Sequence, residues 1–194
     1  ARILARRLLS LGLKRGDRVG IVAETDPMFH RFFFACQYAG LSPFALPAGI
    51  QLGAHTAYVG QIRRMIESCN AAIAVAPASH SEFLDEAVAE MGLVMAGTPE
   101  DFDALPEADV EFEPLGQEDP AYPHYTTRST RFPRGVEINQ ETVLENLRAI
   151  AQDGLKLDNN DRFVSWLPYY HDMGLIGFIL VPLICQLSAD YLPS

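Results

Sequence analysis

The sequence has little positive charge, few cysteines and no long hydrophobic run. Its 15 lysines and arginines are outnumbered by 25 acidic residues, which gives a net charge of −10 at pH 7. That balance argues against a nucleic-acid-binding protein, because such proteins present a basic face. The longest apolar run, from Met173 to Cys185, contains glycine and proline and is too short to cross a bilayer. We expect a cytoplasmic protein without a signal peptide.

Disulfide and metal patterns are also missing. Cys36, Cys69 and Cys185 are odd in number, widely spaced and set among apolar residues. This arrangement favours buried, reduced thiols and predicts no metal site. The sequence shows no Ser-His-Asp order, no paired-carboxylate pattern and no internal repeat. What is present is a globular composition, with 48% apolar and 21% charged residues.

Helical and strand patterns alternate along the first half of the chain. Helical spacing is found in residues 2–9, 28–39, 56–69 and 79–91, and buried-strand patterns in residues 18–23, 42–46, 72–76 and 93–96. We expect Asp26 to cap the second helix, Gly40 to end it and Ser79 to cap the fourth. This alternation predicts an α/β fold, with a mostly parallel sheet flanked by helices.

An acidic segment separates this first α/β portion, residues 1–97, from the rest. Nine residues between Glu100 and Asp119 are acidic, and we expect residues 98–120 to form an extended, solvated connector. The second portion, residues 121–194, has a helix pattern at 140–153, a strand pattern at 162–166 and an apolar helix pattern from 175 to 187, interrupted by Pro182.

The hydroxyl-rich stretch, YTTRSTRFPRGV from Tyr125 to Val136, combines hydroxyl and guanidinium groups. Hydroxyls and free backbone N–H groups donate to phosphates from several directions, and arginine offers a planar fork. We expect a short strand before it and a capped helix after it, which is a common setting for phosphate binding. The Walker pattern is absent. Taken alone, the stretch fits a polar surface loop equally well.

A second segment, the His-Asp motif, reads SWLPYYHDMGLIG from Ser165 to Gly177. Together the two stretches resemble the acyl-adenylate-forming superfamily, specifically the fatty acyl-AMP ligases. Those enzymes carry motifs that look like YTSGST-R-x-P-R-G-V and S-W-L-P-x-Y-H-D-M-G-L-I-G. The match to the first runs from Ser129 to Val136, and the second matches at nearly every position. Residues 16–65 also resemble the family's amino-terminal portion.

The resemblance implies activation of a fatty acid by ATP, with Mg²⁺, to give an acyl-adenylate. The acyl group would then pass to an acyl carrier protein or to a polyketide synthase carrier domain. The acid's carboxylate attacks the α-phosphate and pyrophosphate leaves, so the protein must neutralise and align two anions. The resemblance also implies that the chain is a fragment of a large amino-terminal domain. The carboxy-terminal lid would be absent and the fragment alone inactive.

The resemblance assigns roles to individual residues. His171 would be catalytic, donating a hydrogen bond that orients the substrate carboxylate; outside the motif, a buried structural histidine is the alternative. The phosphate-binding residues implied are Thr126, Thr127, Ser129, Thr130, Arg131, Arg134 and Gly135. The substrate-binding residues implied are Trp166, His171, Asp172, Met173 and Gly174. We expect Trp166, Met173, Leu175 and Ile176 to wall the acyl channel, although core packing explains them equally well.

Two positions depart from the family pattern. Arg128 stands where the family has a glycine, which permits positive φ and close approach of the backbone to phosphates. Pro123 and His124 stand where the family has an aliphatic residue and glutamine, and proline removes a strand donor. These departures leave two alternatives open: an acyl-CoA synthetase of the same superfamily, and a degenerate, non-catalytic adenylation-like module.

Overall fold

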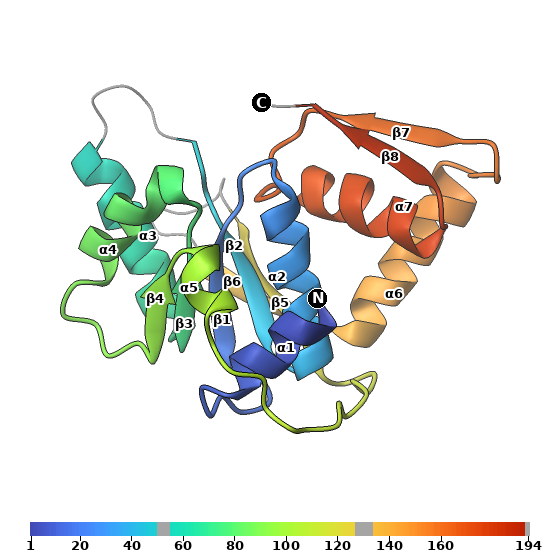
Figure 1. The fold of residues 1–194 in the computed structure, drawn as a ribbon. Helices are drawn as coiled ribbons and strands as arrows, with labels where there is room; N and C mark the ends of the chain where they lie inside the picture. Colours follow the sequence, from blue (N-terminus) through green and yellow to red (C-terminus); the bar gives the residue numbers. More distant parts are fainter. Residues whose placement is uncertain (50–54, 127–133, 193–194) are drawn as a thin grey trace.

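A computed structural model describes residues 1–49, 55–126 and 134–192 of the chain (Figure 1). The first elements are α1 (Arg2–Leu9), β1 (Arg18–Val22), α2 (Pro27–Ala39), β2 (Ser42–Leu46), α3 (His55–Cys69), β3 (Ile73–Val75), η1 (Ala78–His80), α4 (Ser81–Val88), β4 (Met95–Gly97) and α5 (Pro99–Asp103). They are followed by β5 (Pro120–Thr126), β6 (Arg134–Asn139), α6 (Gln140–Arg148), η2 (Ala149–Gly154), β7 (Arg162–Ser165), η3 (Met173–Leu180), α7 (Val181–Ile184) and β8 (Ser188–Tyr191).

The predicted parallel sheet is confirmed. Strands β2, β1, β3 and β4 lie in that order and all pair in parallel. Helices α1 and α2 pack with one face of this sheet, while α3 and α4 lie on the other side (Figure 1). In β1, a Cβ at Gly20 would lie 3.1 Å from the ring of Phe44 on the neighbouring strand β2, so the small residue leaves room for that ring. The sheet is therefore covered on both faces, as parallel sheets usually are.

Helix α2 begins and ends where the sequence predicts. The side chain of Asp26 accepts a hydrogen bond from the backbone N–H of Met28 at 2.7 Å, and Pro27 occupies the first turn, where its missing N–H is harmless. Gly40 ends the helix with φ of 70°. The capping role predicted for Ser79 is wrong. Its hydroxyl donates to Glu24 at 2.8 Å instead, and α4 begins later.

The acidic segment is only in part the solvated, extended connector that its composition predicts. Residues 104–118 contain no helix or strand and are mostly exposed, but the segment is not solvated throughout. It contains the short helix α5, and the side chain of Phe102 in that helix is fully buried. Arg7 donates to Asp103 at 2.8 Å, and Arg15 donates to Asp119 at 2.6 Å. The segment therefore packs against the first portion of the chain, because apolar burial and ion pairs hold residues that solvent would otherwise surround.

The hydroxyl-rich stretch joins two strands. Strand β5 leads into it as predicted, and a strand that the sequence analysis did not predict, β6, follows it and pairs antiparallel with β5. Pro123 lies inside β5 without ending it, as proline can in a strand with a free edge. Asn139 then caps α6, accepting a hydrogen bond from the N–H of Thr142 at 2.9 Å. The predicted capped helix therefore begins where the sequence places it, at Gln140.

The last elements form a small unit in which β7 and β8 pair in parallel. The apolar helix predicted from 175 to 187 begins earlier, with the π-helical segment η3, and continues as α7. Pro182 lies in the first turn of α7, a position that tolerates proline, so it does not break α7. None of the helices in the described ranges is long and apolar enough to span a membrane.

Candidate functional site

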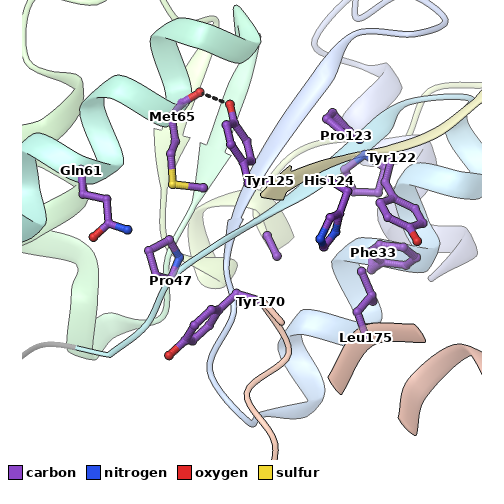
Figure 2. A pocket seen from close by; sticks show the side chains of 12 residues that line it. Phe33, Pro47, Gln61, Met65, Tyr122, Pro123, His124, Tyr125, Tyr170 and Leu175 are labelled. Atoms are coloured by element: carbon purple, nitrogen blue, oxygen red, sulfur yellow. Dashed lines mark hydrogen bonds between the residues drawn. The ribbon is translucent and has the colours of Figure 1, made fainter. Parts of the chain in front are cut away.

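Strand β5 positions the entrance to the hydroxyl-rich stretch. Tyr125 is buried, and its hydroxyl donates to the carbonyl of Met65 at 2.8 Å (Figure 2). The same oxygen lies 2.6 Å from Ser68 Oγ and 2.8 Å from Cys69 Sγ. Burial raises the pKa of Tyr125 above its usual value, so the phenol stays protonated and able to donate. These contacts fix the end of β5 to the last turn of α3.

The neighbouring residue links β5 to the His-Asp motif. The imidazole Nε2 of His124 lies against a carboxylate oxygen of Asp172, and the two form an ion pair when the imidazole is protonated. His124 is largely covered, whereas the Asp172 side chain is 71% exposed. Side chains alternate along a strand, so Tyr125 reaches the helix α3 while His124 reaches the motif. The strand that leads into the hydroxyl-rich stretch is therefore in direct contact with the His-Asp motif.

Both segments also line one cavity, which we call the first hollow (Figure 2). Its walls are formed by Phe33, Pro43, Ala45, Pro47, Gln61, Met65, Tyr122, Pro123, His124, Tyr125, Tyr170 and Leu175. Its volume is about 70 Å³, roughly twice a water molecule's share of liquid volume and well below that of a ligand pocket. The described residues thus enclose a small hollow whose wall combines polar groups with an apolar side.

The turn that carries His171 is built by close backbone contacts. The N–H of His171 donates to the carbonyl of Pro168 at 3.1 Å, and its own carbonyl accepts from the N–H of Leu175 at 2.9 Å. Gly174 is essential to this packing, because a Cβ there would lie 2.1 Å from the carbonyl oxygen of Pro168. The ring of His171 lies beside that of Tyr170, with centroids 4.9 Å apart, and it is exposed. The imidazole is therefore available to a ligand.

Most of the predicted substrate-binding residues do not line the first hollow. His171, Asp172 and Gly174 are not part of its lining, and neither are Trp166 and Met173, which are each 64% exposed. Leu175 does line it, as expected for a channel wall. Gly135 pairs with Tyr125 across the β5–β6 ladder. Thr127, Ser129, Thr130 and Arg131, together with the side chains of Thr126 and Arg134, lie outside the described residues. Their roles stay predictions.

Sequence reasoning missed three contributors to the site. Tyr122 and His124 belong to the strand before the hydroxyl-rich stretch, and Tyr170 precedes His171. Burial raises the pKa of Tyr122 to about 12, so its hydroxyl is neutral at physiological pH. The sequence offered one signal for these three residues, which is that each lies within a few positions of a residue of one of the two motifs. In the described ranges, no group of three His, Cys, Asp or Glu side chains is arranged to hold a metal.

Comparison with known proteins decides the family. The family model of the AMP-binding enzymes matches residues 1–193. The chain belongs to this family. A putative acyl-CoA synthetase of Caulobacter vibrioides is 45% identical over 193 residues, covering 99% of this chain and 33% of that protein. A medium-chain-fatty-acid–[acyl-carrier-protein] ligase of Teredinibacter turnerae is 47% identical over 66 residues, 34% of this chain and 10% of that protein.

A solved structure supports the same assignment for this AMP-binding chain. A chain from structural and functional studies of fatty acyl-adenylate ligases from E. coli and L. pneumophila matches with a TM-score of 0.91 and 44% identity. The match covers 99% of this chain and 34% of that one. The AMP-binding chain thus spans about a third of the length of these relatives.

Proposed function

We propose that the chain is part of a ligase that activates a fatty acid with ATP, forming an acyl-adenylate that is passed to an acyl carrier protein. The observation that carries the proposal is that residues of both motifs, Tyr125 and Tyr170 among them, line the first hollow, next to the His124–Asp172 contact. The proposal is supported by the 44% identity to a chain studied with the fatty acyl-adenylate ligases. It is also supported by the acyl-carrier-protein ligase among the relatives.

The chemistry requires a donor-rich cradle beside an apolar wall. Attack of a carboxylate on a phosphate brings two anions together, and hydrogen-bond donors must offset their repulsion. Hydroxyl and guanidinium groups of the hydroxyl-rich stretch, among them Thr130 and Arg131, would hold the phosphates of ATP. The exposed imidazole of His171 would orient the carboxylate. Leu175 and Phe33 would accept the first carbons of the acyl chain. Magnesium, when bound, would offset phosphate charge.

The test uses the full-length protein. Incubation with ATP, Mg²⁺ and a series of fatty acids is expected to release pyrophosphate and to yield acyl-AMP, detected by mass spectrometry. His171→Ala is expected to lower kcat/KM by about a hundredfold, because one oriented donor to a reacting group contributes about that much. Absence of both pyrophosphate and acyl-AMP with every acid would refute the proposal.

A second candidate, an acyl-CoA synthetase, is favoured by the 45% identity to the Caulobacter protein of that description. The two candidates share the adenylation step and differ in the acceptor. To separate them, the enzyme loaded with acyl-AMP is mixed in parallel reactions with holo acyl carrier protein and with coenzyme A, and the acylated product of each reaction is measured. Transfer to the carrier protein alone supports the ligase, and formation of acyl-CoA at a comparable rate supports the synthetase.

A further inference from the structure

A second hollow lies next to the first. It is formed by α2, β5, α6 and the η3–α7 segment, and the residues that line it include Phe33, Gln37, Tyr122, Gln140, Leu144 and Leu183. Its volume is about 320 Å³, which falls in the range of small-molecule sites. The first hollow, at about 70 Å³, is too small for more than the start of an acyl chain.

The wall of the second hollow is almost wholly apolar. Its two amide side chains, Gln37 and Gln140, are paired with each other by a hydrogen bond of 2.8 Å. Gln37 also donates to the carbonyl of Ala121 at 2.8 Å. The remaining lining side chains are apolar or aromatic, and those of Leu144 and Leu183 are 40% and 56% exposed. An apolar occupant gains by covering such a surface.

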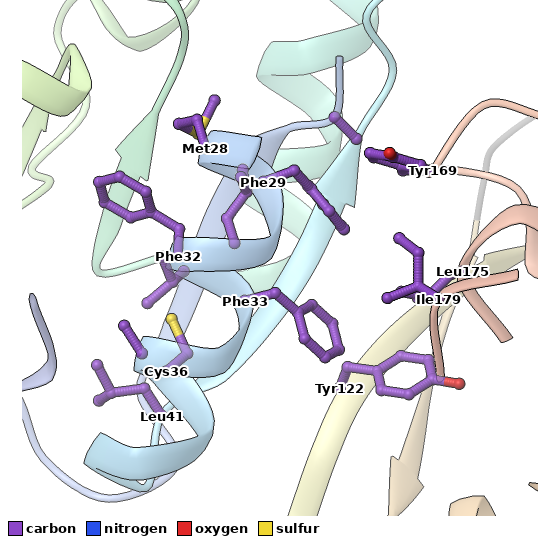
Figure 3. Packing of buried hydrophobic residues seen from close by; sticks show 14 of the residues in the cluster. Met28, Phe29, Phe32, Phe33, Cys36, Leu41, Tyr122, Tyr169, Leu175 and Ile179 are labelled. Atoms are coloured by element: carbon purple, nitrogen blue, oxygen red, sulfur yellow. The ribbon is translucent and has the colours of Figure 1, made fainter. Parts of the chain in front are cut away.

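Two aromatic rings separate the hollows. Phe33 and Tyr122 are the residues that line both, and each is almost fully buried. Their ring centroids lie 6.0 Å apart with the planes tilted by 56°. Figure 3 shows the two rings side by side, facing Leu175 and Ile179 of η3. A chain that enters the first hollow meets these rings before it reaches the second.

We infer that Phe33 and Tyr122 determine acyl-chain length, acting as a two-ring barrier between a head hollow for the carboxyl end and a tail hollow for the distal methylenes of a medium- or long-chain fatty acid. The inference rests on the proposed function and adds to it. Short acids fit in the head hollow alone. Longer acids reach the tail hollow only when the rings rotate apart, so ring size sets the preference among chain lengths.

The test changes the size of the side chain at position 33 in the full-length protein, with the substitutions Phe33→Leu and Phe33→Trp. The ratio of kcat/KM for a long acid to that for a short acid is measured for each. Phe33→Leu is expected to raise this ratio about tenfold and Phe33→Trp to lower it, because a methylene-sized change in an apolar pocket discriminates by that order. Tyr122→Leu is a second variant with the same expected direction.

Phe32→Leu is the matched control. Phe32 lies in the same helix, is fully buried and packs on Phe102 with ring centroids 5.5 Å apart, but it lines neither hollow. The Phe32→Leu variant loses the same kind of ring and is expected to leave the ratio of kcat/KM values for long and short acids unchanged. A shift equal to that of Phe33→Leu, or an unchanged ratio in both Phe33 variants, would overturn the inference.

A measurement on the unsubstituted protein covers the case in which the variants do not fold. A fatty acid with a photoreactive diazirine at its terminal carbon is bound and irradiated, and the labelled peptides are identified. Labels are expected on α6 and α7, around Leu144 and Leu183, which line the tail hollow. Labels confined to other segments would contradict the inference. Because photolabelling needs no turnover, failure of the proposed ligase activity and failure of the barrier give different results.

Discussion

The imidazole of His124 lies against the carboxylate of Asp172, and this contact joins strand β5 to the turn that carries His171. The two residues come from segments far apart in the sequence. Since Asp172 is mostly exposed, the contact contributes little to stability. Its effect is positional: it holds the hydroxyl-rich stretch and the His-Asp motif at the same place.

The first prediction separates position from stability. His124→Ala in the full-length protein is expected to lower kcat/KM for adenylation about tenfold, because the two anionic substrates lose alignment. The melting temperature is expected to change little. His124→Gln keeps a donor and is expected to retain most of the activity. Equal activity in all three proteins, measured as pyrophosphate release, would show that the contact has no role.

The second prediction concerns the anchor of β5. Tyr125→Phe removes a hydroxyl in contact with Met65, Ser68 and Cys69 and is expected to destabilise the protein by about 1–3 kcal/mol. The KM for ATP is expected to rise while the KM for the fatty acid stays constant. Tyr191→Phe, which loses one hydrogen bond to the carbonyl of Phe178, is the control. A rise of the same size in the KM for ATP of the Tyr191→Phe control would contradict this prediction.

The third prediction tests the tight turn at Gly174. Gly174→Ala places a Cβ against the Pro168 carbonyl, at 2.1 Å before relaxation, and is expected to cost about 3 kcal/mol and to abolish adenylation. Gly177→Ala is the control in the same helix, where the nearest atom to a Cβ is 3.7 Å away in Met173. It is expected to change the free energy of unfolding by less than about 1 kcal/mol. Urea denaturation measures both, and equal effects would contradict the account.

The fourth prediction concerns pH. Burial lowers the pKa of His30 below its ordinary value of 6.5, against an opposing effect of Asp26, so the ring is neutral in the folded state. As pH falls below that ordinary value, the unfolded chain takes up a proton that the folded chain does not, and stability decreases. His30→Phe is expected to make the free energy of unfolding less dependent on pH in this range. An unchanged dependence would show that His30 is not responsible.

Much of the fold could be predicted from the sequence because its signals are local. The side chain of Asp26 and the positive φ of Gly40 set the ends of α2 within a few residues. Strand β6 was missed, although Val136 and Ile138 alternate as strand residues do, because the stretch was interpreted by its motif. The helix at Phe102 was missed because acidic neighbours outweighed one buried ring.

The candidate site was predictable only in part. The motif residues His171 and Asp172 could be named from their neighbours in the sequence. The partner of Asp172 could not, because a contact between distant segments leaves no trace in the spacing of a single sequence. The same limit applies to Phe33, whose place between two hollows depends on how α2 packs against β5. Periodicity indicates only that such a residue faces the core.

The central claim is that the two motifs bring ATP and a fatty acid together. Exchange of labelled pyrophosphate into ATP, measured on the full-length protein with and without a fatty acid, tests it most directly. The account predicts exchange that depends on the acid and falls about tenfold in His124→Ala. Exchange that is absent with every acid, or that proceeds equally well without one, would contradict it.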